Sequence, residues 1–164
     1  GIDFSNSFVE AAEVIRKKGK MGYERLEEAQ TTTSLTAKLP PGAKPEAVRF
    51  EQGDAMNLSS SLGSFDLVHA ANLLCRLTSP RKCREQLPKL VAAEGQLVLT
   101  TPCTWLDEFT PRENWPKGST LDYLKEHLEA DFSLLRTQEM PFLIREHRRK
   151  YQWTAAQASI WLRR

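Results

Sequence analysis

The chain has 164 residues, 40% of them hydrophobic, so it can bury a core, and we expect a single domain over residues 1–164. Its 23 Lys and Arg against 21 Asp and Glu give a net charge of only +2, which excludes attraction of the whole protein to nucleic acid or to an anionic membrane. No apolar stretch approaches the roughly 20 residues of a membrane helix, and the start has no signal-peptide pattern. Cys75, Cys83 and Cys103 form no CxxC pair, so we expect a cytoplasmic protein without a disulfide framework or metal site.

The first residues, GIDFS, are typical of the end of a buried strand, yet no strand and no initiator Met stand before them. We therefore expect this chain to be part of a longer protein. The next segment predicts a helix over residues 5–18, because Phe8, Ala11, Ala12 and Ile15 follow helical spacing behind possible caps at Ser5 or Ser7. Residues 19–47 are polar and threonine-rich and contain LPPGAKP, which predicts a long loop or insertion.

The rest of the chain alternates between predicted strands and helices. The run from Phe65 to Leu74 is nearly all apolar, which is typical of a strand buried on both faces, and it would bury His69. Pro88 interrupts a predicted helix near its end, and Gly95 breaks the chain before the next strand. The predicted strands are residues 48–50, 65–74, 96–102, 132–144 and 151–162, the predicted helices are residues 80–91 and 121–132, and residues 145–150 form a charged turn.

Strands alternating with helices favour an α/β sheet, and ligands of such sheets bind beyond the carboxyl ends of the strands. Asp3, Asp54, Asn72 and the loop over residues 101–115 follow predicted strands. An acid in the position of Asp3 can accept hydrogen bonds from both ribose hydroxyls, and Asp54 can accept one from an adenine amino group. For each acid alone, a helix cap or a turn is the competing interpretation.

Several sequence motifs at the predicted strands resemble those of a known protein family. GIDFS, VRFEQGDA, FDLVHAANLLCRL and GQLVLTTP together resemble class I S-adenosylmethionine (SAM)-dependent methyltransferases, from the second strand of their fold to the fifth. The longer strings TWLDEFTPRENW and MPFLIREHRRKYQW are similar to the 4-mercaptohistidine N-methyltransferases. That family completes ovothiol A and is often fused behind a sulfoxide synthase, so the resemblance implies such an upstream partner in the full-length protein.

The resemblance implies a Rossmann-like mixed sheet in the order 3-2-1-4-5-7-6, with an antiparallel last strand. It also implies SAM as the cofactor, with its ribose on Asp3, its adenine near Phe4, Asp54 and Ala55, and Asn72 beside it. The chain departs from the family in one respect: its eight glycines form no glycine-rich turn. We therefore expect the family's first strand and that turn to be absent here, which leaves two strand edges unpaired and predicts weak donor binding without upstream residues.

The implied substrate is a small molecule, a histidine derivative with a thiolated imidazole. Glu108 or Glu113 can accept the second ring proton, Arg112 can hold the carboxylate in a bidentate fork, and Trp105 and Trp115 can flank the ring. A rigid turn with Arg112 paired to one of these glutamates is an equal alternative for Arg112 and Glu113, and a structural role is favoured for the tryptophans. Arg145 and Tyr151 are further substrate candidates, whereas residues 148–150 are better explained as a solvated turn.

The sequence thus predicts a SAM-dependent N-methyltransferase that methylates the imidazole of 4-mercaptohistidine to give ovothiol A. Two alternatives remain open. One is a methyltransferase of the same fold that acts on another small amine or imidazole, and the other is a non-catalytic binding module.

Overall fold

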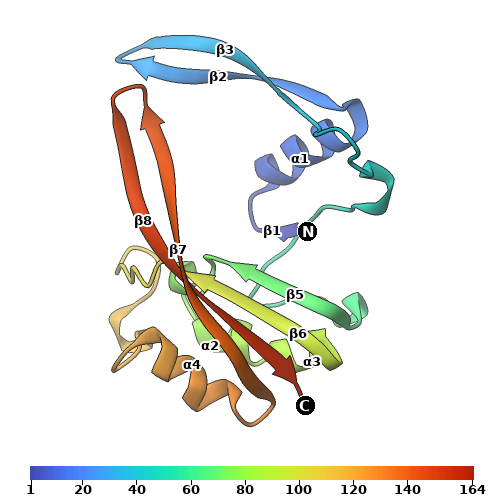
Figure 1. Ribbon diagram of the computed structural model, residues 1–164, viewed down its shortest axis with the longest axis vertical. Helices are drawn as coiled ribbons and strands as arrows, with labels where there is room; N and C mark the ends of the chain where they lie inside the picture. Colours follow the sequence, from blue (N-terminus) through green and yellow to red (C-terminus); the bar gives the residue numbers. More distant parts are fainter. The chain divides into compact units, whose positions relative to one another are not determined.

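The computed structural model describes residues 1–164, which form two compact units (Figure 1). The first unit comprises residues 1–55 and 143–152, and the second comprises residues 56–142 and 153–164. The hairpin of β7 (Phe132–His147) and β8 (Lys150–Arg163) has its tip in the first unit and its base in the second. The expectation of a single domain stays a prediction.

The first unit begins with β1 (Ile2–Asp3) and the predicted helix, α1 (Asn6–Lys18), which is confirmed. The Ser5 hydroxyl caps α1 by accepting a hydrogen bond from the Phe8 N–H, and the helix ends at Gly19, whose left-handed φ of 73° suits a residue without Cβ. β1 pairs in parallel with β4 (Glu51–Gln52). The strand predicted over residues 48–50 is therefore displaced: the structure has it directly after these residues, as β4.

The prediction of a long loop over residues 19–47 is wrong for most of that segment. It contains an antiparallel hairpin of β2 (Lys20–Glu28) and β3 (Thr31–Lys38), in which Tyr23 lies opposite Leu35. The physical reason is that β-branched threonine favours extended backbone even where neither face is buried. Only the proline- and glycine-containing residues 39–44 are irregular, before the short 3₁₀ turn Pro45–Ala47.

The second unit contains a four-stranded sheet in the order β5-β6-β8-β7. β5 (Phe65–Ala71) is parallel to β6 (Val91–Thr101), and β8 is antiparallel to β6. This confirms the mixed sheet with an antiparallel last strand. β1 and β4 form a separate two-stranded sheet, so no hydrogen-bonded pairing joins them to β5.

Helices cover one face of the four-stranded sheet: α2 (Pro80–Arg84), α3 (Leu87–Leu90) and α4 (Thr120–Leu128) (Figure 1). Alternate residues of β6 point into this core, which explains why Leu97 and Leu99 are almost fully buried while Gln96 is exposed. Cys75 and Cys83 are buried there as small apolar groups, as predicted. Other large side chains that are almost fully buried are those of Leu74, Leu124, Leu128, Phe132 and Trp161.

The prediction that the strand after Phe65 is buried on both faces is wrong. Phe65 and Leu67 are 46% and 59% exposed, and His69 is exposed as well, whereas Ala70 on the other face is buried. An apolar run shows that a strand could be buried on both faces, but it does not show what covers each face. Helices cover only one face of this sheet, and β5 is its outermost strand (Figure 1).

The helix predicted over residues 80–91 is two short helices, and Val91 already belongs to β6. Gly95 lies within β6 rather than before it, because the strand continues through a register shift opposite β5. A Cβ at Gly95 would lie 2.9 Å from the Ala92 carbonyl oxygen and 3.0 Å from that of Asp66, so this close approach requires glycine. Similarly, α4 ends at Leu128, and Phe132 opens β7.

Candidate functional site

The carboxyl ends of β1 and β4 lie side by side in the first unit. Asp3 is opposite Gln52, and the Gly53 N–H donates a 3.0 Å hydrogen bond to the Asp3 carbonyl oxygen. A Cβ at Gly53 would lie only 2.8 Å from Ile2 Cγ2, so glycine lets the two chains leave their strands in contact. The structure thereby brings together four predicted donor-binding residues: Asp3, Phe4, Asp54 and Ala55.

Asp3 is exposed and links β1 to α1. Its Oδ1 accepts a 2.8 Å hydrogen bond from the Ser5 N–H, which is the turn role that competed with ribose binding. Its Oδ2 has no protein partner, so the turn uses only one of the two carboxylate oxygens. Both roles are compatible with this geometry.

Phe4 presents a large aromatic surface at the same strand end, with 74% of the residue exposed. The Gln52 amide donates a 3.3 Å hydrogen bond to the Phe4 carbonyl oxygen and ties this segment to β4. Asp54 and Ala55 follow directly and are half-buried. An acid, an exposed aromatic ring and a second acid therefore share one edge.

Asn72 follows β5 in the second unit and has a left-handed φ of 51°. Its N–H donates to both the carbonyl oxygen and the hydroxyl of Thr100, at 2.8 and 3.1 Å, which holds the turn against β6. Its side-chain Oδ1 is buried without a hydrogen-bond partner. A buried amide oxygen and a left-handed asparagine at a strand end are unusual features that cluster at binding sites.

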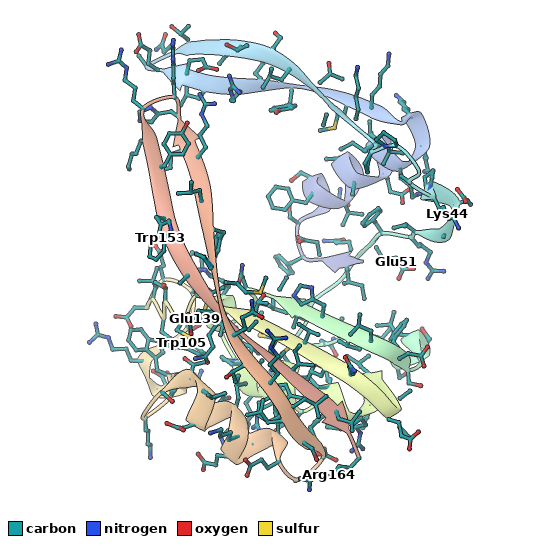
Figure 2. All side chains as sticks on the ribbon, viewed as in Figure 1. Lys44, Glu51, Trp105, Glu139, Trp153 and Arg164 are labelled. Atoms are coloured by element: carbon teal, nitrogen blue, oxygen red, sulfur yellow. The ribbon has the colours of Figure 1, made fainter.

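The loop after β6 is fixed by hydrogen bonds within the second unit. The buried Thr110 hydroxyl donates to the Leu77 carbonyl oxygen at 2.8 Å, and Trp115 Nε1 donates to the Thr110 carbonyl oxygen at 2.7 Å. Trp105, which is labelled in Figure 2, donates from Nε1 to the Thr120 hydroxyl at 3.0 Å, at the start of α4. The indole N–H groups of both half-buried tryptophans therefore hold the loop, which supports the structural role favoured for them.

Arg112 does not pair with Glu108 or Glu113, the partners considered from the sequence. Its Nε donates to both carboxylate oxygens of Asp107 at 2.8–2.9 Å, and its guanidinium lies 5.5 Å from the centre of the Trp115 ring. The terminal nitrogens of Arg112 have no protein partner, so the fork remains open to a ligand. Glu108 and Glu113 are exposed and form no ion pair.

Arg145 and Tyr151 lie in the first unit and line a groove of about 660 Å³ against the β2–β3 hairpin. Sequence analysis missed the other lining residues, because β2 and β3 were expected to be loop. Glu27 lies between Arg25 and Arg145, and its hydrogen bond to Arg25 is the largest cause that lowers the pKa of its carboxyl. The full lining is Arg25, Glu27, Glu28, Thr31, Thr33, Arg145, Arg148 and Tyr151.

The structure contains no group of three or more His, Cys, Asp or Glu side chains with the spacing of a metal site. No helix is both long enough and apolar enough to cross a membrane.

No protein-family model matches the sequence, and no curated protein matches it. Among solved structures, the chain is similar to a SAM-dependent methyltransferase from Methanosarcina mazei, with a TM-score of 0.61 and 12% identity over 99% of this chain and 80% of that one. It is also similar to a protein described for the conversion of a disulfide bond into a thioacetal group during echinomycin biosynthesis, with a TM-score of 0.61 and 13% identity over 99% of this chain. The chain spans 65% of that protein.

A third similar structure is the [4+2]-cyclase SpnF, with a TM-score of 0.53 and 21% identity over 85% of this chain and 44% of that one. The shared architecture is the Rossmann-like fold of class I methyltransferases, which confirms the predicted fold class. Because these identities are low and one similar protein is named as a cyclase, the fold alone does not define the reaction.

Proposed function

We propose that the protein is a SAM-dependent methyltransferase that methylates a ring nitrogen of 4-mercaptohistidine, giving ovothiol A. The observation that carries the donor part is the edge where Asp3 and Phe4 follow β1 while Asp54 and Ala55 follow the parallel β4. The class I methyltransferase fold supports it. The substrate part is supported by the similarity of residues 104–115 and 140–153 to the mercaptohistidine family.

The residues at this edge fit the adenosine part of SAM. Asp3 Oδ2 has no protein partner and is a charged acceptor for ribose hydroxyls, while Oδ1 keeps the backbone turn in place. The exposed Phe4 ring offers an apolar face for adenine, and Asp54 offers an acceptor for its amino group. Asn72 in the second unit is the remaining proposed donor residue, because its buried Oδ1 lacks a hydrogen-bond donor.

The loop after β6 supplies groups that suit a zwitterionic imidazole. The open guanidinium fork of Arg112 suits a carboxylate, and the faces of Trp105 and Trp115 suit a flat ring that is partly cationic. Because Trp115 and Trp105 are hydrogen-bonded to Thr110 and Thr120, both indole rings are held in place before a ligand arrives. Such rigidity lowers the entropic cost of aligning a substrate.

Bound SAM would supply a methyl group on a positively charged sulfur, which is open to in-line attack. The residues of this chain would align the ring and exclude water rather than form covalent bonds. An unprotonated ring nitrogen is already a nucleophile. Glu108 or Glu113 would accept the hydrogen of the other ring nitrogen and so raise the electron density of the attacking one.

A competition assay tests the substrate. The full-length protein is given SAM together with equal amounts of 4-mercaptohistidine, histidine and histamine, and the methylated products are identified by mass. We expect methylated 4-mercaptohistidine to dominate. Methylation of histidine or histamine instead would support the second hypothesis, a different small amine or imidazole, and no methylated product in the presence of bound donor would favour a non-catalytic module.

A further inference from the structure

The groove between the β2–β3 hairpin and the β7–β8 tip has an excess of positive charge. Three of its lining residues are arginines, Arg25, Arg145 and Arg148, and two are glutamates. Glu28 pairs with Arg149, which lies outside the lining, at 3.5 Å. Glu27 is the lining carboxylate that pairs with arginines of the groove, and it pairs with two of the three, Arg25 and Arg145.

Glu27 does not use up the hydrogen-bonding capacity of these arginines. Its Oε1 accepts from Arg25, and its Oε2 accepts from Arg145 Nη2 at 3.0 Å. Arg145 Nε is buried without an acceptor, and the side chain of Arg148 forms no ion pair, although its backbone N–H donates to the Glu27 carbonyl oxygen. A charged donor without an acceptor in a partly buried position is costly, and an anion offsets that cost.

The other lining groups also suit an anion. Tyr151 lines the groove with its ring 6.0 Å from the Arg145 guanidinium, and its hydroxyl can donate a hydrogen bond. Thr31 of the neighbouring strand β3 adds a hydroxyl, while the Thr33 hydroxyl already hydrogen-bonds to the Glu27 carboxylate. Arginines backed by hydroxyl donors are the usual composition of a site for carboxylate or phosphate oxygens.

We propose that this groove binds a small oxyanion, the carboxylate or phosphate group of a metabolite. It is separate from the donor-binding edge, because its lining comes from β2, β3 and the β7–β8 tip, whereas that edge is formed by β1 and β4 (Figure 1). The inference does not depend on the proposed methyl transfer. Arg145 and Tyr151 are assigned to this anion because they line the groove, and not because they belong to a sequence motif.

Calorimetric titration tests the groove, with inorganic phosphate in one series and succinate in another, at constant ionic strength held with chloride. Arg148→Gln removes the unpaired guanidinium from an exposed turn. Arg136→Gln is the matched control, since Arg136 is an exposed arginine of β7 that does not line the groove. Tyr151→Phe removes only a hydroxyl.

We expect saturable binding of at least one probe, weakened five- to tenfold by Arg148→Gln, two- to fivefold by Tyr151→Phe, and less than twofold by Arg136→Gln. Binding of phosphate alone would identify a phosphate site, and binding of succinate alone a carboxylate site. The proposal is overturned if neither probe binds, or if Arg136→Gln weakens binding as much as Arg148→Gln does. Because donor binding is measured separately with S-adenosylhomocysteine, failure here leaves the proposed methyl transfer untouched.

Discussion

Substituting Asp3 by Asn separates its role in the backbone turn from its proposed role in ribose binding. The Asn side-chain oxygen can still accept the 2.8 Å hydrogen bond from the Ser5 N–H, so the turn is kept. What is lost is the negative charge and the second carboxylate oxygen, which has no protein partner. Hydrogen bonds to a charged acceptor contribute about 1.5–3 kcal/mol, so the affinity for S-adenosylhomocysteine should fall about 10- to 150-fold.

The assay is calorimetric titration of S-adenosylhomocysteine into the full-length protein, with thermal unfolding of each variant. Glu10→Gln is a matched control, because it removes one negative charge on α1 and its side-chain oxygen can still accept from the Asn6 amide. We expect this control to change affinity less than twofold. Asp3→Ala removes the turn hydrogen bond as well and should lower the unfolding temperature, whereas Asp3→Asn should not.

One result would refute the reasoning. If Asp3→Asn binds S-adenosylhomocysteine as tightly as the wild type while Asp3→Ala lowers the unfolding temperature, Asp3 serves the turn only.

Three further predictions concern stability. Trp105→Phe removes the hydrogen bond to the Thr120 hydroxyl and should lower the free energy of unfolding by about 0.5–1.5 kcal/mol, measured in urea; an unchanged value would show that this bond does not hold the loop. Gly95→Ala forces a Cβ against two backbone carbonyl oxygens and should cost about 1–3 kcal/mol, and wild-type stability in the same urea titration would contradict the tight approach of β5 and β6. Hydrogen bonding to Arg16 lowers the pKa of Glu13 to about 2, so its stabilising effect is present above the unfolded pKa near 4.5 and is lost as the pH falls through about 2. Glu13→Gln should therefore lower the melting temperature at pH 6 and have a smaller effect near pH 2, and equal effects at both would count against this ion pair.

Local signals in the sequence were enough to predict α1 and the mixed character of the main sheet. The Ser5 cap, the helical spacing of Phe8 and Ile15, and Gly19 at the end all act within one segment, so α1 needs no distant partner to be recognised. The β2–β3 hairpin gives no such signal. Most of its residues are polar, and its few apolar pairs, Met21 with Ala37 and Tyr23 with Leu35, each join two segments, so neither segment alone has an apolar alternation long enough to predict a strand.

Burial and pairing depend on what the rest of the chain provides. The apolar run at Phe65 is compatible with burial on both faces, but helices cover only one face of the sheet that contains β5, so Phe65 and Leu67 stay exposed (Figure 1). Arg112 has three acids within five residues, and which of them it pairs with, Asp107, depends on the conformation of the folded loop and not on spacing alone. The groove joins Arg25 to Arg145, which are far apart in the sequence, so no local pattern could predict it.

The proposed activity of the protein is the transfer of a methyl group to a ring nitrogen of 4-mercaptohistidine. The most direct measurement follows transfer from SAM carrying a ¹³C-labelled methyl group, with the full-length protein and 4-mercaptohistidine, by two-dimensional NMR of the product. We predict a new labelled methyl signal that correlates with carbons of the imidazole ring through a ring nitrogen. A labelled methyl on sulfur, or no transfer while S-adenosylhomocysteine binds, would contradict it.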